Sequence, residues 1–194
     1  MIFYANVIKS FQSHMEKKVL TLVLYRYINQ SFHSFVSGFR KRLSNRPEVC
    51  HNCRGTKFHS HGWRRRYVHH DGRDCHIFIQ RFKCCNCMKT VTILPTFLTR
   101  KFIRTVDDIL FHCIRAFLGL KSRISRQMSD FYKKRFLRCL NPLIMLLKFN
   151  NHNLSLPEKE NKKAIKVIET LQAQFWNSLS ESFFRNTNKH FMAY

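Results

Sequence analysis

Apolar side chains recur at three- and four-residue steps through the first 45 residues. They are Val19, Leu22, Val23, Tyr27, Ile28, Phe32, Phe35, Val36 and Phe39. This spacing places them on one face of a helix. Gly38 and the basic run 40–42 close the pattern, and Pro47 begins a new one. The sequence therefore predicts an N-terminal helical segment over residues 1–47.

From residue 48 to 98 the pattern changes to short runs of alternating apolar and polar residues, at 57–61, 65–69, 76–83 and 90–94. The run from His76 to Phe82 is rich in β-branched and aromatic residues, as strands are. Asp71–Gly72 lies between two such runs and is a strong hairpin signal, because glycine accepts the positive φ of the turn. Residues 48–98 are predicted to form a small antiparallel β unit.

Helical spacing returns after residue 98. One apolar stripe begins after Thr105, the predicted N-cap, and ends before Gly119; it comprises Val106, Ile109, Leu110, Cys113, Ile114 and Phe117. A second, basic helical stretch over 123–140 is expected to be interrupted at Asn141–Pro142. We predict a basic helical segment over residues 99–149.

The last part of the chain begins with a polar connector at 150–157, and a charged helix is expected from about residue 158 to 179. Phe183, Phe184 and Phe191 follow without a clear pattern. Residues 150–194 are predicted to be a C-terminal helical tail. The predicted fold class is therefore α+β, a small antiparallel β unit flanked by helical segments at both ends.

Positive charge concentrates in the middle of the chain. The 35 Lys and Arg residues against 11 Asp and Glu give a net charge of +24. Residues 40–140 hold 24 of the basic and 6 of the acidic residues, so they carry 18 of the 24 net charges. Such a density repels itself unless a polyanion neutralises it, which indicates DNA, RNA or an anionic surface as partner.

Four of the eight cysteines form two C-x-x-C pairs, Cys50/Cys53 and Cys84/Cys87. Two residues between thiolates let one backbone turn aim both sulfurs at a tetrahedral ion. Gly55 is expected to relieve the first turn, and the Asp71–Gly72 hairpin fills the gap between the pairs. The sequence predicts one structural Zn²⁺ held by Cys50, Cys53, Cys84 and Cys87, with Cys84 preferred over Cys85 because it leaves a two-residue gap. An iron–sulfur centre is the alternative.

The first apolar run, residues 19–25, is too short to span a membrane and lacks a cleavage site for secretion. A cytoplasmic protein without membrane contact is expected, and its thiols are then reduced.

The five histidines between the pairs raise the alternative of a metal-dependent HNH nuclease: His59, His61, His69, His70 and His76. That core needs a downstream Asn, and residues 54–83 contain none. The histidines are predicted to be surface residues of the hairpin that add positive charge near phosphate.

Residues 48–104 resemble the N-terminal zinc ribbon of bacterial insertion-sequence transposases and of DUF6431-type proteins. The resemblance is carried by Cys50-x-x-Cys53, by the segment Lys57–Arg66 with its His61-Gly62-Trp63-Arg64, and by Arg81-Phe82-Lys83-Cys84-x-x-Cys87 with the run up to Pro95. Met88 stands where the family has Gly. The helices after residue 105 lack the small residue and Gly of a helix-turn-helix turn.

The resemblance implies a DNA-binding module. A transposase nuclease domain needs three metal-binding carboxylates, and the roughly 100 residues after the ribbon are too few for that fold. We therefore expect a zinc-ribbon nucleic-acid binding protein, related to the binding portion of a transposase and not an enzyme. An RNA-binding or ribosome-associated zinc protein is the alternative.

A basic face with an aromatic plate is expected to contact phosphates and stack a base. The predicted contacts are Lys57, Trp63, Arg64, Arg65, Arg66, Arg81, Lys83, Lys89, Arg100, Lys101, Arg104, Arg123 and Arg126. The Phe-rich helices at both ends offer a surface for a homo-oligomer.

Overall fold

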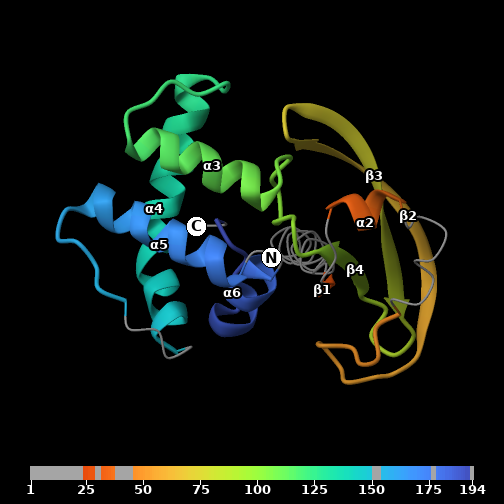
Figure 1. Cartoon of the computed structure of the whole chain (residues 1–194). Coiled ribbons are helices and arrows are strands. Elements are labelled where there is room, and N and C mark those ends of the chain that lie inside the picture. Colours follow the sequence, from red (N-terminus) through yellow and green to blue (C-terminus); the bar gives the residue numbers. More distant parts are fainter. Residues whose placement is uncertain (1–23, 29–31, 38–45, 150–153, 176–177, 193–194) are drawn as a thin grey trace, which may run out of the picture. The chain divides into compact units, whose positions relative to one another are not determined.

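The computed structural model describes residues 24–28, 32–37, 46–149, 154–175 and 178–192 (Figure 1). The elements in chain order are β1 (Leu24–Ile28), α2 (Phe32–Ser37), β2 (Phe58–His70), β3 (Arg73–Cys84), β4 (Thr90–Pro95), α3 (Val106–Phe117), α4 (Arg126–Phe149), α5 (Glu160–Phe175) and α6 (Leu179–Thr187). A sheet is thus followed by helices, which confirms the predicted α+β class.

The four strands form one sheet in the order β1-β4-β3-β2. Strands β3 and β4 are antiparallel, with Phe82 opposite Val91. Strands β2 and β3 are joined by Asp71 and Gly72, whose φ angles of 48° and 73° are both positive, as the two central residues of a type I′ hairpin turn require. The predicted hairpin is therefore confirmed.

Strand β1 corrects the prediction of a helix through residues 24–28. Its sequence Leu-Tyr-Arg-Tyr-Ile is aromatic and β-branched, and it finds a partner in β4. A helix does form at Phe32–Ser37, but it is only six residues long. The rest of the predicted N-terminal helical segment up to residue 45 lies outside the described residues.

The chain forms two compact units, each assembled from separate stretches of sequence. Of the described residues, one unit comprises 24–26, 46–65 and 78–93, and we call it the ribbon unit. The other, the helical unit, comprises the described residues of 27–37, 66–77 and 94–192. The predicted division into four consecutive segments, 1–47, 48–98, 99–149 and 150–194, stays a prediction. The two units describe which residues are compact in space and do not test boundaries along the sequence.

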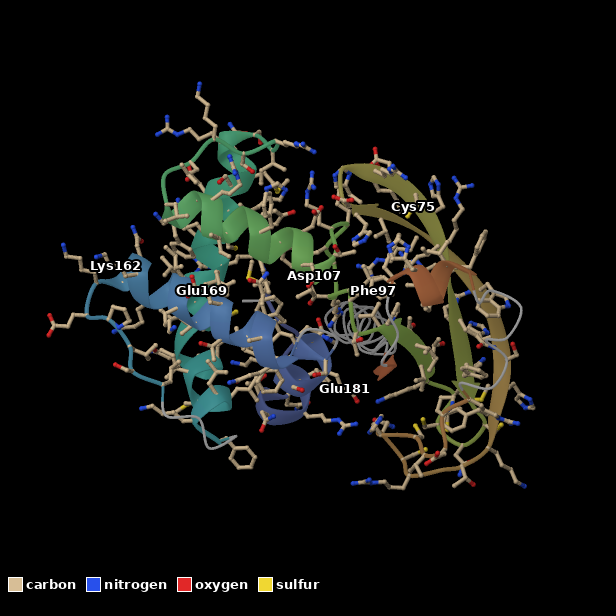
Figure 2. All side chains as sticks on the ribbon, viewed as in Figure 1. Cys75, Phe97, Asp107, Lys162, Glu169 and Glu181 are labelled. Atoms are coloured by element: carbon tan, nitrogen blue, oxygen red, sulfur yellow. The ribbon has the colours of Figure 1, made fainter. Side chains whose placement is uncertain are left out.

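The core of the helical unit lies among α3, α4, α5 and α6, and α4 contacts the other three. Helix α3 begins as predicted: the Thr105 side chain accepts a hydrogen bond from the Asp108 backbone N–H. It ends before Gly119, which has a φ of 70°. The outer side of α5 is charged and exposed, as Lys162 and Glu169 show (Figure 2).

Helix α4 runs without a break through Pro142, so the predicted interruption at Asn141–Pro142 is wrong. A proline inside a helix removes one hydrogen bond and costs about 3 kcal/mol. Leu143, Leu146 and Leu147 follow it and are buried in the core. Burying three leucines contributes roughly 1.5–3 kcal/mol each, which outweighs the loss.

The C-terminal residues that showed no pattern form helix α6 and a short tail. Phe183 and Phe191 are completely buried and pack edge to face, with ring centroids 5.7 Å apart. The tail is held by the Thr99 hydroxyl, which donates to the Phe191 carbonyl, and by Arg135, which donates to the Met192 carbonyl, each at 2.7 Å. These phenylalanines are therefore core residues of the helical unit.

Candidate metal centre

The four predicted ligands meet in the ribbon unit. Their sulfur atoms all lie within 4.8 Å of one another. The Cys50 and Cys87 sulfurs are 3.7 Å apart, and those of Cys53 and Cys84 are 3.5 Å apart. Four sulfurs bound at 2.3 Å to a tetrahedral Zn²⁺ are separated by about 3.8 Å. The cluster therefore fits a zinc ion.

The backbone holds the two cysteine pairs in the same way. In the first, the Cys50 N–H donates to the Gly55 carbonyl and the Arg54 N–H donates to the Cys50 carbonyl, both at 2.8 Å. In the second, the Cys84 N–H donates to Lys89 and the Met88 N–H donates back to Cys84, both at 3.0 Å. Two equivalent knuckles thus present their sulfurs to one point, with Cys50 and Cys84 completely buried.

Gly55 has a different role from the one expected, because the positive φ of the first knuckle falls on Arg54, at 61°. A Cβ at Gly55 would lie 2.8 Å from the side chain of Asn86 in the second knuckle. Glycine therefore leaves room for the Asn86 side chain beside the first knuckle. Lys89 joins the two knuckles, because its ammonium donates to the Asn52 side-chain oxygen at 2.6 Å.

The thiols influence one another's ionisation. Burial opposes the Cys87 thiolate, but the Lys89 backbone N–H and the three other sulfurs favour it, so its pKa is lowered to about 7. At Cys53 the Gly55 backbone N–H favours the thiolate, yet desolvation and the sulfurs of Cys84, Cys87 and Cys50 outweigh it and raise the pKa to about 12. The cluster thus favours one thiolate and resists another. A divalent cation supplies the positive charge that lets several thiolates coexist.

The remaining cysteines lie outside the cluster. Cys85 is adjacent to Cys84, but its backbone N–H donates to the Lys57 carbonyl, and the four-sulfur cluster includes Cys84 and not Cys85. Cys113 is buried in the core of the helical unit, as its place on the apolar stripe predicted. Burial raises the pKa of Cys113, and it raises that of Cys139 to about 11. Both behave as small apolar side chains.

Seven of the predicted nucleic-acid contacts belong to the ribbon unit: Lys57, Trp63, Arg64, Arg65, Arg81, Lys83 and Lys89. Lys57, Arg64 and Arg65 are exposed, and the others are half-buried. Arg81 and Lys83 lie on the face of β3 opposite buried Phe82, since alternate residues of a strand share a face.

The other six predicted contacts belong to the helical unit: Arg66, Arg100, Lys101, Arg104, Arg123 and Arg126. Arg66 and Arg104 bind groups of their own chain. Arg66 donates to the carbonyls of Thr99 (2.8 Å) and Phe102, and Arg104 forms an ion pair with Asp108 at 2.9 Å. Lys101, Arg123 and Arg126 are exposed.

Sequence reasoning missed a cavity in the helical unit, to which the hairpin tip, α3, α5 and the α3–α4 connection contribute. Asp107, Phe111 and Arg115 line it at four-residue spacing. That spacing is readable in the sequence, but nothing there shows that the hairpin tip lies beside it.

Fold and site together define a mixed α+β protein with a four-cysteine cluster suited to a zinc ion. Comparison with protein families, curated proteins and solved structures finds no match to the chain. None of the described helices has the length and apolarity needed to cross a bilayer.

Met88→Gly is expected to stabilise the zinc-loaded protein by about 1 kcal/mol, because a side chain with positive φ is strained and glycine is not. Met88 has a φ of 59° and its side chain is 60% exposed, so little buried surface is lost. Denaturant unfolding measures the gain. Met88→Ala is the control: alanine keeps the Cβ, so an equal gain from it would contradict this explanation.

Proposed function

We propose that the chain is a zinc-ribbon protein that binds nucleic acid, with DNA as the preferred partner. The observation that carries this proposal is the combination of two cysteine knuckles, whose sulfurs meet in one cluster, with cations on the strands that join them. Arg64 and Arg65 lie on β2, and Arg81 and Lys83 on β3, in the same unit as the four cysteines. A rigid strand pair that displays cations contacts phosphates at little entropic cost.

The resemblance to transposase zinc ribbons supports DNA as the partner, and on this proposal the chain is a binding module without a nuclease. Zinc would act only on structure, since four cysteines leave no open position for substrate. A plasmid cleavage assay with Mg²⁺, Mn²⁺ or Zn²⁺ tests the nuclease alternative, and cleavage by the purified chain would establish it.

Affinity for a DNA duplex is expected to fall about 100-fold between 50 and 200 mM salt, as the release of counterions from about four phosphates implies. Fluorescence anisotropy of a labelled duplex measures this. Arg64→Ala/Arg65→Ala should reduce the slope of log affinity against log salt by about 1, because adjacent strand residues point to opposite faces and only one of the two reaches a duplex bound to one face.

Lys162→Ala/Lys166→Ala is the matched control, because it removes the same charge from exposed positions on α5. Equal effects of the two double variants would show that only net charge matters. Tighter competition by structured RNA than by duplex DNA would favour an RNA-binding protein instead.

Self-association through the Phe-rich helices stays a prediction. Phe136, Phe183 and Phe191 are buried, so in the helical unit the contact would fall to exposed rings such as Phe131 and Phe149. Light scattering over a range of protein concentrations tests it.

A further inference from the structure

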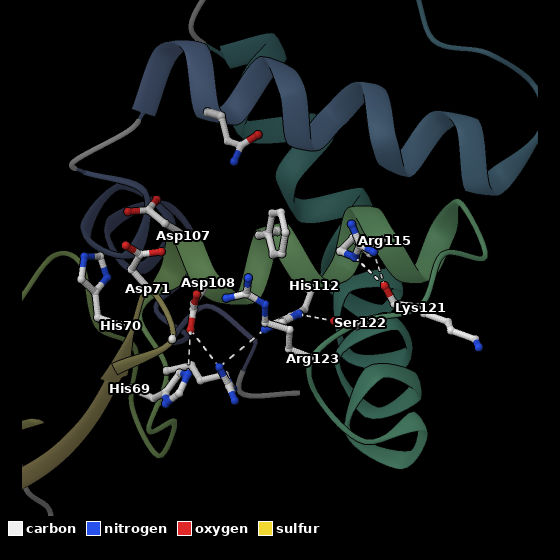
Figure 3. A pocket seen from close by; sticks show the side chains of 14 residues that line it. His69, His70, Asp71, Asp107, Asp108, His112, Arg115, Lys121, Ser122 and Arg123 are labelled. Atoms are coloured by element: carbon white, nitrogen blue, oxygen red, sulfur yellow. Dashed lines mark hydrogen bonds and ion pairs between the residues drawn. The ribbon is translucent and has the colours of Figure 1, made fainter. Parts of the chain in front are cut away.

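The helical unit contains an open cavity of about 1050 Å³ (Figure 3). Side chains from the hairpin tip, α3, the α3–α4 connection and α5 line it. The volume is that of a small-molecule site, which commonly measures about 300–1,000 Å³. The four cysteines are not among the lining residues, so the cavity is separate from the metal centre.

One face of α3 carries three different chemistries into this cavity. Asp107, Phe111 and Arg115 line it at positions i, i+4 and i+8. Residues four apart on a helix are neighbours along one side, with a rise of about 6 Å between them. A carboxylate, an aromatic ring and a guanidinium therefore follow one another along the wall. The ring of Phe111 is 50% exposed.

The far end of this wall is positively charged. The Arg115 Nε donates to the Lys121 carbonyl at 2.7 Å, and its guanidinium carbon lies 5.7 Å from the centre of the Phe111 ring. Lys121 and Arg123 line the same end, and neither forms an ion pair with a carboxylate of the described residues. Arg123 also reaches the hairpin turn, 3.5 Å from where a Cβ of Gly72 would lie. Three cations are thus available to an anion.

The opposite end of the wall, at the start of α3, carries a carboxylate that stabilises nothing in the fold. Asp108 is paired with Arg104 at 2.9 Å, with the His69 ring 3.9 Å away (Figure 3). Asp107 has neither a hydrogen bond nor an ion pair with any described residue. Burial and the neighbouring Asp108 charge raise its pKa to about 6. Its charge at neutral pH therefore destabilises the folded protein, as is common at binding sites.

We propose that this cavity binds a guanine nucleotide. The Asp107 carboxylate accepts hydrogen bonds from N1–H and the N2 amino group of the base, and Phe111 stacks on the base. Arg115, Lys121 and Arg123 bind the phosphate. A carboxylate selects guanine because only guanine presents two adjacent donors on its Watson–Crick edge. In adenine and cytosine the amino group lies beside an acceptor nitrogen, and this nitrogen repels a carboxylate oxygen.

The dimensions agree with this assignment. Asp107 and Arg115 are eight residues apart on α3, which is about 12 Å along the helix axis. This is comparable to the length of a nucleoside monophosphate from the edge of the base to the phosphate. The inference goes beyond the proposed function, because no residue of the ribbon unit contributes to the cavity.

Calorimetric titration of the full chain with GMP, AMP, guanosine and inorganic phosphate tests the proposal. GMP should bind at least about tenfold more tightly than each of the other three, since each lacks at least one of the matched contacts. A free nucleotide and an unpaired guanosine within a strand share this chemistry. Short single strands with and without one guanosine distinguish them: preference for the guanosine strand over GMP would identify a nucleic acid as the source.

Asp107→Asn and Phe111→Ala should each weaken GMP binding by about tenfold or more. Phe149→Ala is the control, because this ring is 77% exposed and does not line the cavity. Asp107→Asn should also raise the Tm at pH 8 by roughly a few degrees, since it removes a charge whose folded-state pKa lies above the unfolded value of 3.8. A higher Tm in the Asp107→Asn variant would show that it loses GMP binding without losing its fold.

Equal binding of GMP and AMP would overturn the proposal, as would an Asp107→Asn variant that binds GMP like the parent. Absence of binding to both GMP and the guanosine-containing strand would overturn it as well. Binding of inorganic phosphate as tight as that of GMP would reduce the cavity to an anion site and contradict the role of Asp107 and Phe111.

Discussion

Cys84→Ser is expected to lower bound zinc from one ion per chain to near zero and to unfold the knuckles. Cys84 is completely buried, and its sulfur lies 3.5 Å from that of Cys53. Its backbone N–H and carbonyl also close the second knuckle. The binding energy of a structural zinc ion, roughly 10–16 kcal/mol in zinc-finger peptides, is folding energy. Removing one of four ligands therefore removes both the metal and the order that it maintains.

Metal analysis of the purified chain and hydrogen exchange measure this result. Amide protection should fall over residues 46–65 and 78–93, whereas α3–α6 should keep theirs, because these helices have a core of their own. Cys85→Ser is the matched control: it changes the adjacent thiol, which lies outside the cluster, and should retain one zinc. Full zinc in the Cys84→Ser variant would show that the cluster is not the metal site.

Phe136→Ala should destabilise the helical unit by about 3–5 kcal/mol, the usual cost of removing a buried phenylalanine. Phe136 is completely buried on α4, and its ring packs edge to face against Phe117 and Phe191, at 5.9 and 6.5 Å. The cavity left behind would face α3 on one side and the C-terminal tail on the other. Denaturant unfolding followed by the helical circular dichroism signal measures the loss.

Phe149→Ala, at the exposed end of the same helix, is the control and should change stability by less than about 0.5 kcal/mol. Zinc content should be unchanged in both variants, since the ligands belong to the ribbon unit. A loss of zinc in Phe136→Ala would mean that the two units do not fold independently. A small effect on stability would mean that the core accommodates the cavity by collapse.

The two proposed sites use charge differently. In the ribbon unit the cations Arg64 and Arg65 are exposed, and they suit the sequence-independent capture of phosphates. In the helical unit the Lys121 carbonyl orients Arg115, and the unused carboxylate of Asp107 lies about 12 Å away along α3. This arrangement suits a ligand that carries hydrogen-bond donors at one end and negative charge at the other. Capture of a polyanion and selection of one nucleotide are thus assigned to different residues.

The four cysteines of the cluster could be chosen from the sequence alone. A C-x-x-C pair is a local feature: two intervening residues determine how far apart two sulfurs can lie, whatever the rest of the chain does. The same holds for the Asp71–Gly72 turn and for the Thr105 cap of α3, both confirmed, because each depends on residues within one turn of backbone. Local geometry needs no distant partner.

Other features were decided by residues far away in the chain. Residues Leu24–Ile28 form a strand because β4 supplies hydrogen-bond partners, and α4 continues through Pro142 because the core rewards the leucines that follow. The cavity exists only where the hairpin tip lies beside α3, at His69 and Arg104. Sequence spacing alone determines which side chains share a face of a helix or strand. Tertiary packing alone determines which distant element packs against that face, because the free energy gained by burying a side chain depends on the residues that cover it.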